Sequence, residues 1–173
     1  LRPSATPSLR PGTSPTPGSG TCVNCQYQAN LFWGPVISSF AGGLRYTTTT
    51  NRLITTVGNT TSSYPGCTLN PILPQTPPSI PTFPSGCDNP IGRGLLRGTI
   101  DTTNVNIPGG YISATITNTS NTCSYPIGLA SYKASGSNID TQNLFDFRVL
   151  NLPPKETHTI VVKSPMNNDA PSC

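Results

Sequence analysis

CQYQANLFWGPVISSF, residues 25–40, is the most apolar stretch of this chain and contains its single tryptophan. Every second residue in its first half carries an apolar or aromatic side chain: Tyr27, Ala29, Leu31 and Trp33. Alternation at period two is typical of a β-strand with one buried face, and a proline interrupts such a strand. The stretch therefore predicts a strand over 26–33 and a short extended piece over 35–40. It has to be buried against a sheet of its own chain or of a neighbouring copy.

The composition favours a small extracellular β protein. Of the 173 residues, 34% are hydrophobic and 9% are charged, against roughly 45–50% and about 25% in ordinary globular domains. That apolar content suffices for one thin sandwich core. The net charge is only +4 and the basic residues are scattered, which argues against a nucleic-acid partner. No run approaches the ~18 apolar residues of a membrane span, so we expect no membrane insertion.

The chain divides into four parts by composition and hydrophobic pattern. Residues 1–21 are a Pro/Ser/Thr-rich extended tail, suited to polyproline II structure and O-glycosylation or simply a solvated terminus. Residues 22–57 hold the apolar stretch and a possible hairpin over 44–57, and residues 58–94 form a Pro-rich loop. Residues 95–173 contain short apolar runs between Gly, Pro and Asn turns, which predicts an all-β, antiparallel Ig-like sandwich. Its expected strands are 95–100, 105–107, 111–120, 125–135, 143–152 and 157–164.

The cysteines and glycosylation motifs indicate secretion to an oxidising, extracellular or cell-surface location. The six cysteines are Cys22, Cys25, Cys67, Cys87, Cys123 and Cys173, and the two candidate glycan acceptors are Asn59 and Asn118. Cys67 and Cys87 bracket the Pro-rich loop, so we predict a disulfide between them; the alternative is a surface arm that lies across a neighbour. Cys22 and Cys25 form a CxxC motif with no second pair at zinc spacing, which favours structural disulfides. Leu1-Arg2-Pro3 resembles a processed mature end.

Catalytic groups are scarce, so we predict that the protein is not an enzyme and binds no cofactor or metal. Asp146 lies between Phe145 and Phe147, whose inward orientation would send the carboxylate to solvent. His158, the only histidine, is expected on an exposed strand position without a nucleophile nearby. A glycan platform could be made of Trp33, Tyr27 and Tyr46, but a core position is the favoured interpretation of the tryptophan.

Three segments carry a resemblance to a recurrent unit of uncharacterised bacterial secreted and cell-surface proteins. They are NTCSYPIGLASYK (121–133), NLFDFRVLNLPPKETHTIVV (143–162) and PSC (171–173). In that unit the closing Pro-Ser-Cys leads directly into a segment similar to YQANLFWGPV, which here stands near the start of the chain at 27–36. The resemblance implies an extracellular β domain in permuted order, with the N-terminal segment as a detached strand.

Two arrangements follow from the permuted order: the detached strand fills the groove of its own domain or that of the next copy. We favour the second, which is β-strand donation and builds a head-to-tail filament. The protein is then a structural subunit of an extracellular, pilus-like homopolymer, with a monomeric adhesion or carbohydrate-binding module as the alternative. The assembly strand would use Tyr27, Ala29, Leu31, Trp33, Val36 and Ile37. The same arrangement pairs Cys123 with Cys173 and places Cys22 or Cys25 across the junction.

Overall fold

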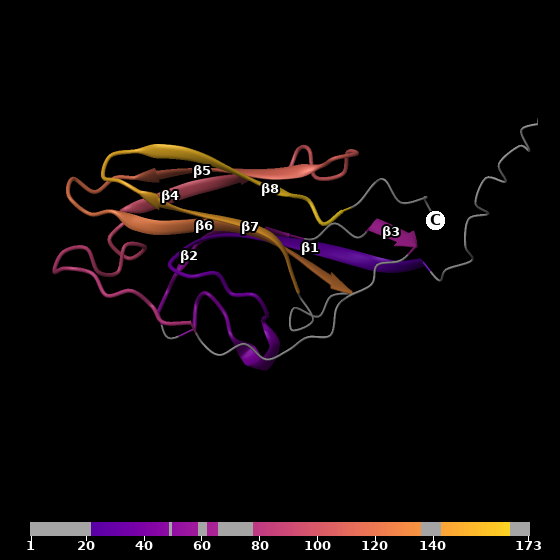
Figure 1. Cartoon of the computed structure of the whole chain (residues 1–173), viewed down its shortest axis with the longest axis horizontal. Helices are drawn as coiled ribbons and strands as arrows, with labels where there is room; N and C mark the ends of the chain where they lie inside the picture. Colours follow the sequence, from indigo (N-terminus) through magenta and orange to yellow (C-terminus); the bar gives the residue numbers. More distant parts are fainter. Residues whose placement is uncertain (1–21, 49, 59–61, 66–77, 136–142, 167–173) are drawn as a thin grey trace, which may run out of the picture.

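Two antiparallel β-sheets stack face to face in the computed structural model, which describes residues 22–48, 50–58, 62–65, 78–135 and 143–166 (Figure 1). The larger sheet has the order β2-β1-β6-β7, with β3 also paired to β1. Its strands are β1 (Cys22–Trp33), β2 (Leu53–Gly58), β3 (Ser62–Pro65), β6 (Tyr125–Ser135) and β7 (Asn143–Leu152). The smaller sheet has the order β4-β5-β8, built from β4 (Leu96–Asp101), β5 (Tyr111–Asn118) and β8 (Thr157–Lys163). The all-β, antiparallel class predicted from the sequence is confirmed.

Strand β5 shows most directly how the sequence pattern makes the smaller sheet. Its side chains alternate between the core and the outer surface, and Ile112, Ala114 and Ile116 are at most 1% exposed. β5 is the central strand, hydrogen-bonded to β4 on one side and to β8 on the other. β-Branched residues at period two fit this half-buried setting. The strongest strand signal of the sequence thus lies at the centre of its sheet.

Strand β1 is the central strand of the larger sheet. It pairs with β6 from Cys25↔Ser135 to Trp33↔Ile127 and with β2 on its other edge. The inward side chains of β1 are almost completely buried between the sheets, from 0% exposure at Leu31 to 5% at Tyr27. They pack with core residues from both sheets, including Ile116 and Leu129. The opening stretch of the sequence is therefore the middle of the main core.

Residues 34–48 and 50–52 form a second layer over the outer face of the larger sheet. Gly34 has a φ of 81°, a backbone conformation that favours glycine, and with Pro35 it turns the chain away from the sheet. A short 3₁₀ turn, η1 (Ala41–Gly43), follows. The apolar side chains of this layer cover the outward faces of β1 and β6 in a smaller cluster of Phe32, Ile37, Phe40, Tyr46, Ala130 and Tyr132.

Three strand predictions change in the structure. The extended piece over 35–40 is not a strand, so Val36 and Ile37 belong to the outer layer rather than to an assembly strand. The hairpin over 44–57 is reduced to β2, because the first part of that range is occupied by the outer layer. Residues 105–107 form a turn, although Val105 is buried in the core. Within the described residues, no helix is long and apolar enough to cross a membrane.

Candidate assembly interface

The side chains proposed as a glycan platform are in the interior. Trp33 and Tyr46 are each 2% exposed, and Tyr27 is 5% exposed. The indole nitrogen of Trp33 donates a hydrogen bond to the Asn51 carbonyl at 3.0 Å, and its ring lies 5.4 Å from that of Phe83. A buried indole whose N–H is bonded is a core residue. The interpretation of the tryptophan as a core anchor is confirmed, and these three residues do not form a surface platform.

Because β1 is central, strand donation would require the β1 of a neighbouring copy to take this same place in the sheet. In this single chain, β1 fills the sheet of its own molecule, which is the intramolecular arrangement. Along the chain, β1, β2 and β3 are joined to β4 by residues 66–95, which include the Pro-rich stretch. The same β1–β6 register would form if a neighbour supplied β1, because an exchange changes the connection between units and leaves the contacts between strands intact. Donation between copies stays a prediction.

A buried polar network fastens the outer layer to the sheet. The Tyr46 and Tyr132 hydroxyls lie 2.7 Å apart; Tyr132 donates to the Ile37 carbonyl and Tyr46 accepts from the Ile37 N–H. Burial raises the pKa of Tyr46 to about 12 and raises the pKa of Tyr132 as well. Arg52, 3% exposed, donates to the carbonyls of Trp33 and Pro35 and lies over the Tyr46 ring. The network satisfies backbone groups freed where β1 ends.

Asn118, one of the two candidate glycan acceptors, is fully buried. Its side-chain amide donates to the carbonyls of Cys123, Leu152 and Pro153 at 2.7–3.1 Å. Its side-chain oxygen accepts from the Ser120 N–H. The nitrogen that would carry a glycan is thus engaged in the interior, so a glycan at Asn118 does not fit the folded chain. The Asn-Thr-Ser motif here is a structural element that joins the end of β5 to β6 and β7.

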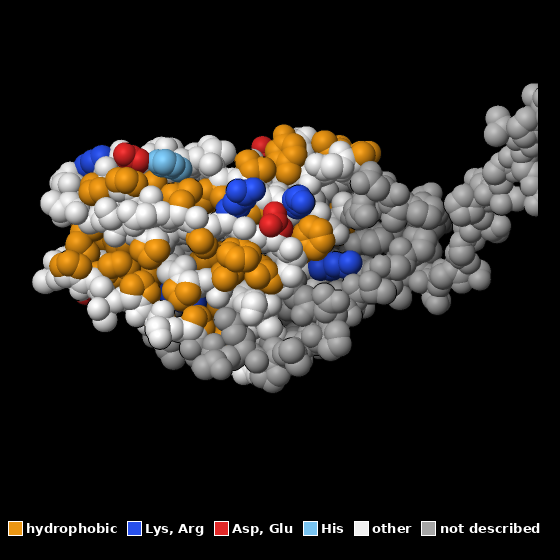
Figure 2. Space-filling model, viewed as in Figure 1, with side chains coloured by type: hydrophobic (Ala, Val, Ile, Leu, Met, Phe, Trp, Pro, Cys, Tyr) orange, Lys and Arg blue, Asp and Glu red, His pale blue; other side chains and the backbone are white. Residues whose placement is uncertain are grey.

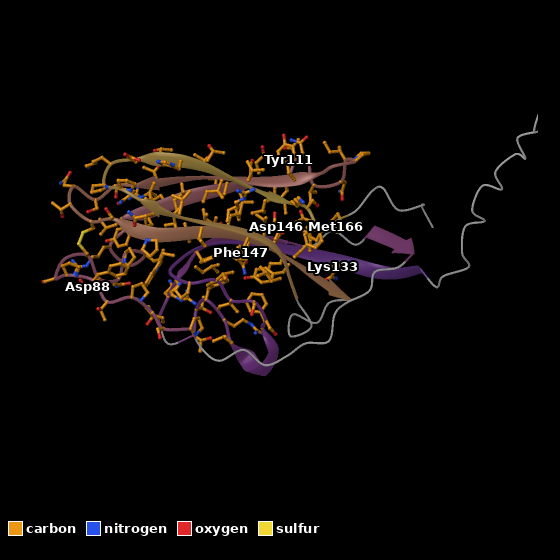
Figure 3. The ribbon with its side chains drawn as sticks, viewed as in Figure 1. Asp88, Tyr111, Lys133, Asp146, Phe147 and Met166 are labelled. Carbon is orange, nitrogen blue, oxygen red and sulfur yellow. A yellow bond between two sulfur atoms is a disulfide. The ribbon has the colours of Figure 1, made fainter. Side chains whose placement is uncertain are left out.

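The disulfide observed in the structure differs from those expected. Cys87 is bonded to Cys123, with 5.7 Å between their Cα atoms (Figure 3). The predicted Cys67–Cys87 and Cys123–Cys173 pairs are therefore wrong. The Tyr125 hydroxyl donates to the Cys87 carbonyl at 2.8 Å, so the bridge lies where the segment before β4 meets the start of β6. Sequence spacing does not reveal that these two loops converge at one end of the sandwich.

The open side of the sandwich is formed by β7 and β8, which are the edge strands of their two sheets. Between them lies a groove of about 700 Å³ that extends to Gly110 and Tyr111 at the start of β5. Asp146 and Arg148 line it from β7 and Lys163 from β8. Figure 2 looks onto this side and shows acidic and basic side chains close together above a band of hydrophobic ones.

Asp146 lines this open groove on the face of β7 toward the smaller sheet, whereas the sequence placed it on the opposite, outer face. Its carboxylate accepts a hydrogen bond from the Lys163 N–H at 2.7 Å, and the Ser131 hydroxyl donates to the Lys163 carbonyl at 2.9 Å. Phe145 and Phe147 are instead 46% and 42% exposed. The pairing of β6 and β7 shifts register between Ser131 and Tyr132, so β7 carries apolar residues on both faces and its alternation is not decisive.

The outer face of β7 continues the apolar surface of the second layer. Val149 is 53% exposed, and with Phe147 it lines a hollow of about 330 Å³ beside Pro35, Val36, Pro81 and Pro126. Figure 3 shows Asp146 on the side of β7 that faces the smaller sheet and Phe147 on the opposite side. One edge strand thus presents charges on one face and apolar side chains on the other.

His158 lies near the start of β8, opposite Ile116 of β5 and on the same side of the strand as the buried Ile160 and Val162. Its Nε2 is 2.7 Å from a carboxylate oxygen of Glu156, and its side chain is 41% exposed. Among the described residues, no three His, Cys, Asp or Glu side chains gather as a metal ion would require. His158 is thus partly exposed at the end of the sheet, but it does not face outward as predicted, because the alternation of β8 puts it on the core-facing side.

Five predicted residues cannot be placed as sites. The side chains of Cys22 and Cys25, and the whole of Asn59, Cys67 and Cys173, lie outside the described residues. The β7–β8 groove, in contrast, was not expected, because nothing in the sequence shows which strands become edges. Comparison of the chain with known family models, curated proteins and solved structures finds no match.

Proposed function

We propose that this protein is a secreted structural subunit of an extracellular filament or pilus-like fibre, with an Ig-like sandwich whose β1 is donated head-to-tail between copies. The central position of β1 carries the proposal. The strand supplies the middle of the larger sheet, yet it belongs to an N-terminal unit that joins the rest of the chain only through the Pro-rich connection. The larger sheet of every copy needs a strand at this central position. That strand can be the β1 of the same chain or the β1 of a neighbouring copy.

The energy of β1 burial explains why the remaining strands would need a partner strand. Complete burial of a large apolar side chain contributes roughly 1.5–3 kcal/mol, and Tyr27, Leu31 and Trp33 are all almost fully buried. Loss of β1 would also free the edge of β6 that faces it. The total is comparable to the whole stability of a typical domain, about 5–15 kcal/mol. A copy whose own β1 is withdrawn therefore has to accept one from a neighbour.

The connection places the exchange point before Cys87. The Cys87–Cys123 disulfide holds the C-terminal end of the connection against the sandwich. Prolines restrict the backbone of the stretch that precedes it and favour an extended path between two bodies. In the proposed fibre, a connection restrained in this way would link β1 in one copy to the remaining strands in the next.

A cross-linking experiment tests the donation. Ala29 and Ser131 are register partners in β1 and β6. Because Pro126 directs its carbonyl to β1, the strand alternation makes Ala29 and Ser131 a non-hydrogen-bonded pair, the kind whose side chains are closest. In assembled A29C/S131C protein, we expect the new disulfide to join successive copies. A denaturing, non-reducing gel would show a ladder, and mass spectrometry would identify the linked peptides.

The matched control is T117C/T157C. These two threonine hydroxyls lie 2.8 Å apart on β5 and β8, which belong to the same unit and cannot exchange separately. Their disulfide should leave single chains on the same gel. If the A29C–S131C link also stays within single chains and negative-stain microscopy shows only monodisperse particles, the proposed donation is refuted.

A further inference from the structure

Strand β7 is a long edge strand that combines two features known to deter pairing, the register shift with β6 and the charges of Asp146 and Arg148, with an exposed apolar face. It is ten residues long, and its sequence NLFDFRVLNL contains neither proline nor lysine, two residues that natural edge strands use to prevent association. Three of its side chains, Phe145, Phe147 and Val149, are 42–53% exposed. A long edge with exposed apolar side chains is the sheet feature most prone to add another strand.

The backbone groups of Phe147 and Val149 point away from the sheet. Pro126 has no N–H, and its carbonyl accepts the Gly34 N–H at 2.8 Å on the β1 side. Pro126 therefore makes no ladder bond to Asn151, its register partner in β7. Antiparallel pairs alternate between bonded and non-bonded, so Asn151, Val149 and Phe147 direct their N–H and C=O groups to the open edge.

The charges of β7 select one register for pairing with a second copy. Asp146 and Arg148 flank Phe147 on the face toward the groove. In an antiparallel pair centred on Phe147, each Asp146 lies opposite the Arg148 of the other copy, and Phe147 lies opposite Phe147. Moving the centre to Asp146 or to Arg148 would instead place two like charges opposite each other, which is destabilising.

The hydrogen bonding agrees with this register. Centred on Phe147, the two Phe147 residues form a bonded pair, which uses the backbone groups that face the open edge. The Asp146–Arg148 pairs are then of the non-bonded kind, in which side chains lie closest. Arg148 makes no ion pair with any of the described residues, so its guanidinium is available to the second copy's carboxylate.

We propose that β7 pairs antiparallel with β7 of a second copy of this chain, centred on Phe147 and joined by reciprocal Asp146–Arg148 ion pairs, so that the two larger sheets become one. This contact is symmetric and closes on itself, unlike the head-to-tail donation of β1. The two contacts involve different strands and do not depend on each other.

Charge exchange tests the pairing. In sedimentation velocity of the full chain, the wild type should contain a concentration-dependent species with twice the mass of the chain. R148D places acid opposite acid and D146R places base opposite base, so each variant alone should lose that species. Mixed together, the two variants regain opposite charges at both positions and should form a heterodimer. R97D, the same charge change at an exposed site on β4, is the matched control and should behave as the wild type.

Two measures keep the outcome decisive. The Asp146 carboxylate also accepts a hydrogen bond from the Lys163 backbone N–H, so D146R could lose its fold. F147K, at an exposed position, is a second way to place like charges at the centre of the pair. It should also be monomeric in sedimentation velocity. Circular dichroism checks the fold of each variant. A wild type that is monomeric at every concentration, or an R148D variant that still dimerises, overturns the proposal. Filaments formed through β1 would sediment far faster than a dimer and persist in R148D.

Discussion

Asn118 shows how one residue can unite strands of both sheets. Its amide donates to three carbonyls, two of them at the end of β7 and just after it, while the residue itself ends β5. A buried carbonyl that loses its donor pays a desolvation penalty. The polar motif that suggested a surface glycan is therefore part of the interior.

We expect N118A to lower the free energy of unfolding by about 1–3 kcal/mol, because three buried carbonyls would lose their donors. N118D should cost at least as much, since a carboxylate would face the same carbonyl oxygens. Urea unfolding followed by fluorescence measures both effects. Asn121, an exposed neighbour, is the control, and N121A should change stability by at most about 0.5 kcal/mol. Equal stability of N118A and N121A would contradict the structural role.

The tyrosine pair under the outer layer predicts a loss of stability in alkali. Burial raises the pKa of Tyr46 from 10.0 to about 12. The contribution of its protonated hydroxyl to the free energy of unfolding is therefore fully present below pH 10. Above pH 10 the unfolded chain releases the proton while the folded chain keeps it. Stability should therefore fall by up to about 1.4 kcal/mol per pH unit and per tyrosine as the pH rises from 10 to 12.

Thermal unfolding between pH 9 and 12, with phenolate absorbance to follow ionisation, measures this loss. Y46F removes one of the two ionising groups and should reduce the slope of stability against pH, although it also removes the acceptor for the Ile37 N–H and lowers stability at neutral pH. A flat stability profile above pH 10 would contradict the burial of the pair.

At the scale of elements, β1 and β4 approach closely because Gly98 has no side chain. A Cβ atom at this position would collide with the Leu31 side chain of β1 and lie 2.9 Å from the Thr115 carbonyl of β5. The glycine thus sets the distance at which the central strand of one sheet packs on the other sheet.

We expect G98A to lower the free energy of unfolding by about 1–3 kcal/mol, the usual cost of overpacking a core. Combined with L31A, which removes the colliding Leu31 atoms but not the close Thr115 carbonyl, part of the cost of G98A should disappear, and a double-mutant cycle in denaturant would measure that coupling. T99A, on an exposed neighbouring position, is the control. Purely additive effects of G98A and L31A would contradict this packing.

Strand β7 shows where the alternation of a sequence is insufficient. Leu150 packs against the main core, whereas Leu144 packs against the outer cluster, and the register shift with β6 lies between them. The apolar residues of β7 therefore do not define one buried face. In β5, where no register shift occurs, the alternation predicts the buried residues without error.

At the scale of the whole molecule, the Cys87–Cys123 disulfide joins the two sheets at one end. Cys87 precedes β4 of the smaller sheet and Cys123 precedes β6 of the larger one, with a sequence separation of 36. Loops of this length that are closed by a disulfide typically add about 2–4 kcal/mol by restricting the unfolded chain.

The double substitution C87A/C123A should therefore lower the free energy of unfolding by about 2–4 kcal/mol. The midpoint of guanidinium unfolding measures the change, and S124A, next to the bridge on an exposed residue, is the control. Since the disulfide also anchors the connection that precedes β4, the variant should additionally show more exchange of β1 in the cross-linking experiment. An unchanged midpoint would show that the bridge carries no stability.

The sequence by itself determined the all-β class, most of the antiparallel strands from residue 95 onward and the burial of the stretch around Trp33. These follow from local patterns, because side-chain alternation and turn residues act over a few positions. Only the tertiary structure decided that β1 is the central strand of the larger sheet, that Cys87 pairs with Cys123, that Asn118 is internal, and that β7 and β8 are edges beside a charged groove. Each of these depends on which distant segments meet, and that is set by the packing of the whole core rather than by any single stretch.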